Sequence, residues 1–258
     1  MICRHLAIVI SAACLALAFG CGTEEKPPTT GGDYFPLTVG NWWLYTESDN
    51  DPDTDWASRP VRHEVVDYEE KDFEHDAEGA LPVFVVANTF PDAAGDDDPR
   101  IEYVLDDGTR VLRKRQEVYE TEVFVGEPKK VRDYEPGLLR FDRSRNTVGD
   151  NWAEYYTTYT VSIPPDLDPI EGDGEHQVDY VFEILEPETV TVPAGTFDCT
   201  VLMRQITVGN RVEEKIYYFA PGVGKVKEAT TTGSSNESIY KVEELDEYYV
   251  VPAADGGV

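Results

Sequence analysis

Apolar and polar residues alternate over much of this 258-residue chain, with the period of two that a β-strand with one buried face requires. Val178, Tyr180, Phe182 and Ile184, for example, alternate with polar neighbours such as Asp179. A similar alternation covers residues 155–163. No segment keeps the 3.6-residue period of a helix beyond a turn or two. The pattern therefore predicts an all-β protein.

Turn residues separate the predicted strands. Asp107-Gly108, a strong type I′ hairpin signal, lies between apolar runs at 101–105 and 110–112. Further turns are predicted at 193–195, 209–210 and 233–236, which implies a C-terminal meander of about six strands over roughly residues 178–246. We expect a single curled antiparallel sheet, as a half-barrel or an open barrel. A two-sheet sandwich is the alternative.

The N-terminus has the form of an export signal. Its apolar run at residues 6–19 is shorter than the roughly 20 residues that a membrane-spanning helix needs, which favours a cleaved segment. Gly20 before Cys21 resembles a lipobox, in which a small residue precedes the cysteine that is lipidated. We expect cleavage between Gly20 and Cys21. Cleavage before Cys14, or a secretory signal in which Cys21 is incidental, are the alternatives.

These features divide the chain into four parts: a lipoprotein signal peptide at 1–20, a lipidated N-terminus with a flexible polar tether at 21–33, a β domain at 34–250 and a disordered tail at 251–258. Several acyl chains, palmitate among them, would hold Cys21 stably in a membrane leaflet. Gly22 in place of Asp favours the outer membrane, by resemblance to enterobacterial sorting. The expected location is the bacterial cell envelope, at the periplasmic or the surface face.

Charge excludes one class of partner. The chain has 22 Lys and Arg residues against 51 Asp and Glu, and removal of the signal takes away Arg4, which leaves a net charge of −30. Such a surface repels nucleic acid, so we expect no nucleic-acid partner. Cys199 would be the one free cysteine left after processing and acylation, and its apolar surroundings in the sequence predict a buried structural thiol.

Three segments resemble those of a family of uncharacterised bacterial lipoproteins: YFPLTVGNW at 34–42, VTVPAGTF at 190–197 and YYFAPGVGK at 217–225. The family implies an exported, curled antiparallel sheet, similar to the half-barrels of periplasmic lipoprotein carriers, and no reaction. The residues that carry the resemblance are Pro36, Gly40, Trp42, Pro193, Gly195, Phe197, Pro221, Gly222 and Gly224. Their types predict turns and core packing first, and a binding loop second.

One internal echo accompanies these motifs. Residues 39–45 recur approximately as 148–155, where a glycine turn again delivers a Trp and then a Tyr into a strand. A duplication of 34–140 as 141–250 would explain the echo. A shared way of starting a strand is the alternative that we favour.

Catalytic motifs are absent from the sequence. It contains no G-x-S-x-G segment, and His63, His75 and His176 lack the spacing of a zinc site. We interpret these histidines as surface or edge residues, and predict no catalytic residue, no cofactor and no defined metal site. Acidic runs at 49–55, 96–98 and 166–175 offer the oxygen ligands that calcium prefers, although solvated loops are the simpler interpretation.

Residues 110–145 are locally basic, with ten Lys and Arg residues against seven Asp and Glu. Cross-strand ion pairing is the favoured interpretation, and a face for an acidic partner is the alternative. Taken together, the sequence predicts a lipid-anchored, non-enzymatic envelope lipoprotein that binds an unknown ligand or protein partner through a curved sheet. A calcium-stabilised structural or adhesion lipoprotein is the alternative, and an unrecognised hydrolase is a remote one.

Overall fold

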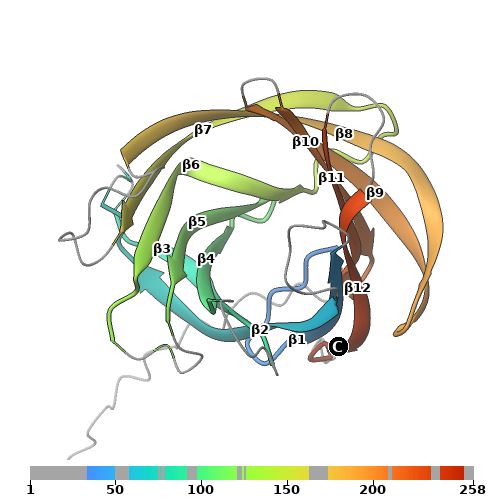
Figure 1. Ribbon diagram of the computed structural model, residues 1–258, viewed down its shortest axis with the longest axis horizontal. Helices are drawn as coiled ribbons and strands as arrows, with labels where there is room; N and C mark the ends of the chain where they lie inside the picture. The colour runs from blue at the N-terminus through green and yellow to red at the C-terminus, as the bar shows by residue number, and fades with distance from the viewer. Residues whose placement is uncertain are drawn as a thin grey trace, which may run out of the picture.

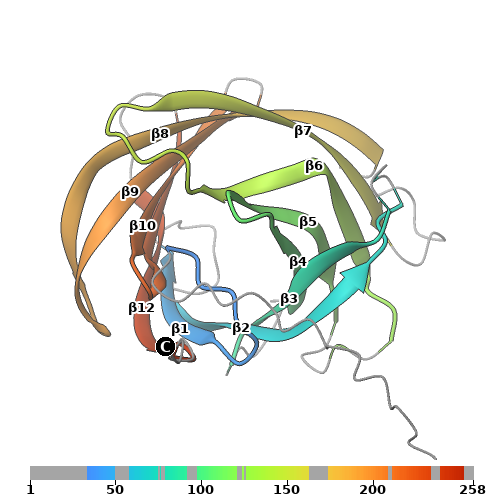
Figure 2. The same cartoon turned by 180° about the vertical axis from the view of Figure 1, so that it is seen from behind.

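The protein is a closed antiparallel β-barrel of twelve strands (Figures 1 and 2). This computed structural model describes residues 34–49, 58–74, 76, 79–91, 98–120, 124, 126–162, 174–208, 211–233 and 239–252. The strands are β1 (Trp42–Asp49), β2 (Ser58–Lys71), β3 (Leu81–Thr89), β4 (Arg100–Asp106), β5 (Arg110–Val118), β6 (Lys130–Asp142), β7 (Asn151–Ser162), β8 (Gly174–Val192), β9 (Gly195–Val208), β10 (Arg211–Ala220), β11 (Gly224–Gly233) and β12 (Ile239–Tyr249).

The all-β prediction is confirmed, but the half-barrel, open-barrel and sandwich predictions are wrong. Each strand pairs with its neighbour in sequence, and β1 pairs with β12 from Trp42 opposite Tyr249 to Asp49 opposite Lys241. This last pairing closes the sheet. Turn residues in a sequence report only hairpins between neighbouring strands, so they cannot reveal a pair formed by the two ends of the domain.

The C-terminal meander contains five strands instead of the predicted six. Residues 178–184 and 189–192 belong to one strand, β8, because the chain stays in the sheet through Pro187. The pairing of β8 with β9 shifts register between Leu185 and Glu188, which marks an irregularity around the proline. A proline lacks the N–H that a regular ladder uses, so strands accommodate it at such bulges.

The predicted turns lie between the strands that they were expected to join. Gly108 and Gly195 have φ values of +85° and +143°, in the range that favours glycine. Residues 209–210 and 234–236 lie outside the described residues, but the strands on either side pair as predicted.

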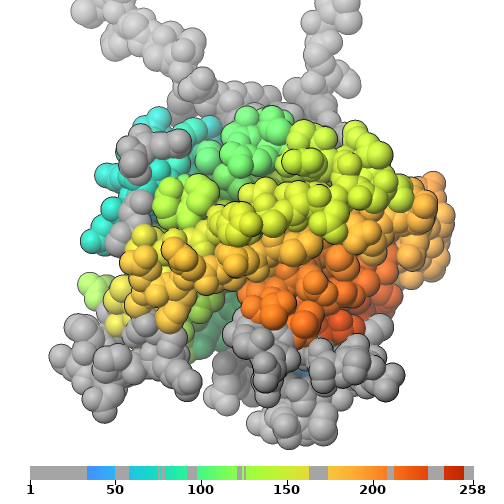
Figure 3. Space-filling model, turned by 90° about the horizontal axis from the view of Figure 1, so that it is seen from above, coloured from blue at the N-terminus to red at the C-terminus, as the bar shows by residue number. Residues whose placement is uncertain are grey.

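Two layers of apolar packing hold the barrel. The main core lies inside it and includes Phe84, Phe182, Phe219, Leu202 and Leu245, all of them fully buried. Residues 34–41 precede β1 and run within the outline of the barrel in Figures 1 and 2, so that they pack against this core. A smaller cluster, which includes residue 73, lies against the outer faces of β3 and β4. From the side, the wall from green to orange forms a continuous surface (Figure 3).

The echo between 39–45 and 148–155 corresponds to the same local hydrogen bonding. Gly40 N donates to Val65 O at 2.8 Å, and Gly149 N donates to Ile184 O at 2.8 Å. In both places the residue after the glycine donates from its N–H to the threonine carbonyl three residues earlier, at 2.9 Å. The echo is thus a shared way of starting a strand, while duplication of the halves stays a prediction.

Candidate functional site

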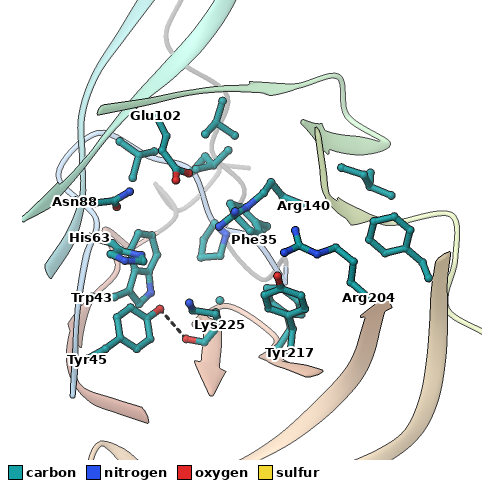
Figure 4. Close-up of a pocket in the computed structure, with 18 residues that line it drawn as sticks. Phe35, Trp43, Tyr45, His63, Asn88, Glu102, Arg140, Arg204, Tyr217 and Lys225 are labelled. Carbon is teal, nitrogen blue, oxygen red and sulfur yellow. Dashed lines mark hydrogen bonds between the residues drawn. The ribbon is translucent and has the colours of Figure 1, made fainter. Parts of the chain in front are cut away.

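The barrel interior is a cavity with an apolar floor and a charged chamber. The floor joins the segment before β1 to inward residues of the strands: Phe35, Pro36, Leu37, Trp43, Val86, Val104, Leu139, Phe182 and Phe219. Its free volume is about 60 Å³. The chamber has a free volume of about 280 Å³ and adjoins the floor through shared residues such as Tyr217 and Asn88. Figure 4 shows how the residues around the floor surround the space.

The charge of the chamber is opposite to that of the chain. Its lining contains nine cationic residues: Arg59, Arg100, Arg113, Arg132, Arg140, Arg204, Lys215, Lys225 and Lys241. Among the described residues, only four carboxylates join them: Glu47, Glu102, Glu228 and Glu243. The chamber thus takes nine of the 22 basic residues of the chain but only four of its 51 acidic residues. The lining therefore has a formal excess of five positive charges, which favours anions over cations in this space.

Ion pairs neutralise one part of the chamber, formed by β10, β11, β12 and β1. Lys215 and Lys225 contact Glu228 at 2.9 Å and 2.8 Å, and Lys225 also contacts Glu243. Burial alone raises the pKa of Glu228, but the two lysines outweigh it and hold the pKa well below its usual value. Glu228 is therefore ionised and stabilises the two lysines beside it. On β1, Glu47 is 1% exposed and pairs with Arg59 at 2.6 Å.

Arg113 on β5 has its own carboxylate. Its Nη1 lies 2.6 Å from Oε1 of Glu102 on β4. Burial raises the pKa of Glu102, but the charge of Arg113 and, more distantly, that of Arg140 lower it below its usual value. Glu102 is therefore ionised, and its charge is largely neutralised by the ion pair with Arg113.

Four arginines of the chamber form no ion pair with a carboxylate of the described residues: Arg100, Arg132, Arg140 and Arg204. Arg132 donates from Nε to Oγ1 of Thr160 at 3.2 Å. Arg204 is only 8% exposed, and its guanidinium lies 4.9 Å from the ring centre of Tyr180. Stacking on an aromatic face holds a guanidinium in place and leaves its N–H edge available.

Arg140 reaches the cavity through an irregularity in β6. On the neighbouring strand β5, Val111 pairs with Phe141 and the following residue pairs with Leu139. Arg140 has no partner in this pairing and is therefore the extra residue of a β-bulge. A bulge re-aims side chains, and here Leu139 and Arg140 both line the cavity although they are consecutive. In Figure 4 the side chains of Arg140 and Arg204 both extend into the cavity.

His63 also lines the cavity, so its interpretation as a surface or edge residue is wrong. Its ring centre lies 5.1 Å from that of Tyr45 on β1. Burial, followed by the charge of Lys225, lowers the pKa of His63 to about 4. His63 is neutral at pH 7 and adds no charge to the site. His176 is exposed on β8, and residue 75 lies outside the described residues.

Two of the three family motifs meet at the floor. The Cδ of Pro36 and the Nε1 of Trp43 would each lie 3.4 Å from a Cβ added to Gly224. Trp43 donates from Nε1 to the carbonyl of Val223 at 2.5 Å, and Gly222 and Gly224 have positive φ values of 73° and 101°. Pro221 is exposed beside them. The turn interpretation is confirmed, and the turn forms part of the floor.

Other motif residues lie away from the cavity. Trp42 faces the outer side, where the guanidinium of Arg62 lies 4.4 Å from its ring centre, and it is Trp43 that lines the floor. Alternation of adjacent aromatics predicts one Trp on each face, but it does not say which faces inward. The third motif turns β8 into β9: Pro193 is exposed, Gly195 has a positive φ value and Phe197 packs on Tyr248. Gly40 starts β1, as described above.

The locally basic segment 110–145 contributes both to cross-strand ion pairs and to the chamber, and a face for an acidic partner stays a prediction. Arg115 contacts Asp133 at 2.5 Å and Arg143 contacts Asp106 at 2.9 Å, as cross-strand ion pairing predicts. Arg132 and Arg140 instead contribute to the chamber. Sequence reasoning flagged this segment but did not identify a lumen, because the residues that line it come from eleven of the twelve strands and are separate in sequence.

The remaining predictions fall in two groups. Cys199 is buried and forms no disulfide, and burial raises the pKa of its thiol to about 11, which confirms a structural thiol. Gly20, Cys21 and most of the acidic runs lie outside the described residues, so lipidation and calcium binding stay predictions. Within the described ranges, no group of three or more candidate ligands could hold a metal ion. The described part also contains no helix that is long and apolar enough to cross a membrane.

Two solved structures are similar to this chain. A "putative exported protein with YmcC-like fold" from Bacteroides fragilis NCTC 9343 has 16% identity and a TM-score of 0.47, over 83% of this chain and 98% of that one. A "putative lipoprotein" from Parabacteroides distasonis ATCC 8503 has 18% identity and a TM-score of 0.42, over 86% and 100%. No protein-family model and no curated protein matches the chain.

Proposed function

We propose that this protein is a lipid-anchored, non-enzymatic lipoprotein of the bacterial cell envelope whose barrel binds a small negatively charged ligand. The observation that carries the proposal is the reversal of charge. A chain with 51 acidic and 22 basic residues lines its chamber with nine cations and four carboxylates. Buried like charges are costly unless something compensates them, and clusters of charged residues in a cleft are candidates for binding sites.

Shape supports the same conclusion. Ligand sites are concave and contain a few convergent polar groups beside apolar and aromatic walls, and mouths of β-barrels are frequent locations for them. The chamber and the floor together have this composition. The predicted export signal and lipidation of Cys21 support a location outside the cytoplasm, where the barrel would hold or deliver its ligand while tethered to a membrane.

A charge series tests the proposal. We would titrate the mature chain, from residue 21 with Cys21→Ala to avoid acylation, with isobutyl phosphate, isobutanol and isobutylamine by calorimetry. These probes have similar apolar groups and differ in charge. We expect binding of the phosphate only, and recovery of the probe unchanged, because the proposed function includes no catalysis.

Two charge reversals locate the site. Arg132→Glu introduces a negative charge into the chamber and should lower the affinity for isobutyl phosphate at least about tenfold. The substitution removes the attraction of the arginine and adds the repulsion of a carboxylate. Arg110→Glu makes the same change at the exposed β4–β5 turn and should leave affinity unchanged. If the phosphate fails to bind the unsubstituted chain, or if both variants bind it equally, the chamber is not an anion site.

A further inference from the structure

The two arginines that line both the floor and the chamber, Arg140 and Arg204, differ from the other cations of the cavity. Arg140 is turned inward by a β-bulge, and Arg204 is buried and stacked between Tyr180 and Tyr217, whose ring centres lie 4.9 Å and 5.4 Å from its guanidinium. Neither forms an ion pair with a carboxylate of the described residues, although four carboxylates line the same chamber. Both side chains line the floor and the chamber and extend into the cavity (Figure 4).

Like charges that line one partly buried space repel each other, and a bound anion reduces this repulsion. A guanidinium presents a rigid planar fork of N–H donors that matches the oxygens of carboxylates and phosphates. One carboxylate has two oxygens and one charge, which suit a single fork. A phosphate or sulfate ester has three terminal oxygens in a tetrahedral arrangement, so two forks can bind it from different sides.

The floor limits the rest of the ligand. Phe35, Trp43 and Phe219 give it an aromatic lining, but its free volume of about 60 Å³ is well below the roughly 150 Å³ of an engineered protein cavity that holds benzene. A long acyl chain therefore does not fit. The larger free volume, about 280 Å³, lies in the chamber.

We propose that Arg140 and Arg204 together bind one tetrahedral oxyanion of the ligand, a phosphate or sulfate group, and that the floor receives a compact apolar group of the same molecule. This inference rests on the proposed anion-binding function and names the chemical class of its ligand. It makes the protein a binder of small polar esters and excludes a carrier of long-chain lipids.

Three probes with the same isobutyl group test the oxyanion, and a long-chain phosphate tests the size of the apolar group. We would compare isobutyl phosphate, isobutyl sulfate, isovalerate and dodecyl phosphate by calorimetry, with the quenching of tryptophan fluorescence as a second signal. The tetrahedral anions should bind at least about tenfold more tightly than isovalerate, and the stronger of the two identifies the group. Dodecyl phosphate should bind no better than isobutyl phosphate. Equal binding of isovalerate, or affinity that rises with chain length, would overturn the inference.

Substitutions test the two residues. Arg140→Met and Arg204→Met should each lower the affinity for the preferred probe at least about 30-fold, because each leaves the oxyanion with one guanidinium group instead of two. Arg140→Lys keeps the positive charge but lacks the planar set of N–H donors, and should lower the affinity for the preferred probe about tenfold. Arg100→Met removes a chamber cation that belongs to neither fork, and should cost less than about threefold. Thermal melts identify folded variants; if the buried Arg204 proves essential for folding, the two Arg140 variants decide.

The outcomes separate this inference from the proposed function. If anions bind but Arg140→Met and Arg140→Lys leave affinity unchanged, the chamber binds anions through its other cations and the inference is wrong. If no anion binds the unsubstituted chain, both proposals are wrong.

Discussion

Single residues in this barrel have properties that only its lumen explains. His63 is an example: its sequence position predicted an ordinary surface histidine, and its pKa is instead lowered to about 4. Burial is the main cause, and Lys225 and Arg140 add to it, while Glu243 and Glu102 oppose them. The neutral ring packs beside Tyr45, and the lumen does not favour a further positive charge.

The lowered pKa predicts how stability depends on pH. An unfolded chain protonates this histidine below about pH 6.5, whereas the folded chain does so only below about pH 4. Below pH 6.5 the unfolded state therefore binds more protons, so the free energy of unfolding falls as the pH falls toward 4. The largest contribution of one such group is about 3 kcal/mol.

His63→Gln should reduce this loss, and urea unfolding between pH 7 and pH 5 measures it. Many carboxylates also titrate at the lower end of the range, so the comparison is the difference between variant and unsubstituted chain at each pH. His176→Gln, at an exposed position of β8, is the matched control and should leave the pH dependence unchanged. An unchanged slope for His63→Gln would show that the lumen does not depress this pKa.

At the scale of elements, the β10–β11 turn and the segment before β1 form the floor together. Gly224 has a φ value of +101°, and an added Cβ would meet Pro36 and Trp43, each at 3.4 Å. We expect Gly224→Ala to destabilise the protein by about 1–3 kcal/mol, from backbone strain and the displaced floor. Gly108→Ala separates the two causes, because Gly108 has a similar φ value of +85° and open space around it.

Thermal melts of both variants measure the contribution of the close approach. Gly224→Ala should lower the midpoint more than Gly108→Ala, and it alone should shift tryptophan emission, since Trp43 lies against the turn. Equal losses of stability would mean that strain of the backbone accounts for the whole effect.

The sequence allowed the strands and hairpins to be predicted because these depend on neighbouring residues. Asp107-Gly108 marked its turn, and the alternation around Phe182 marked its strand. The lumen depends on which of two alternating faces turns inward, and local periodicity leaves that choice open. In β10, Lys215, Tyr217 and Phe219 share the inner face, a mixture that would also suit a solvent-exposed side. Arg140 was unpredictable for another reason, since its bulge breaks the alternation.

For the whole molecule, closure by β1 and β12 is the property that turns a sheet into a container. Thr46 and Glu244 are direct partners across this pairing. Paired residues of antiparallel strands have Cα separations of about 4.5–5.5 Å, within the range of disulfides. Thr46→Cys with Glu244→Cys, in the mature chain with Cys21→Ala, should therefore form a disulfide on mild oxidation. Peptide mapping without reductant detects it.

A second cysteine pair controls for collisions between mobile segments. Thr157 lies on β7, which does not pair with β1, so Thr46→Cys with Thr157→Cys should stay reduced under the same conditions. Formation of both disulfides, or of neither, would contradict a closed barrel with this order of strands.

Closure also separates two opposite electrostatic environments. The wall and loops carry the acidic excess of the chain, while the lumen has an excess of cations. An approaching anion therefore meets repulsion at long range and attraction only inside. The screening length falls from about 30 Å at 0.01 M salt to about 8 Å at 0.15 M, so added salt removes the outer repulsion first.

The kinetics of binding should reflect this order. Between 0.01 M and 0.15 M salt we expect the association rate of isobutyl phosphate to rise by a few-fold, in contrast to anion sites on basic proteins, whose association slows with salt. Stopped-flow measurement of tryptophan fluorescence gives the rate. Long polyanions such as DNA cannot enter the lumen and should not bind at either salt concentration. An association rate that falls with salt would mean that the cations act beyond the rim, and the barrel would then not select small anions over large ones.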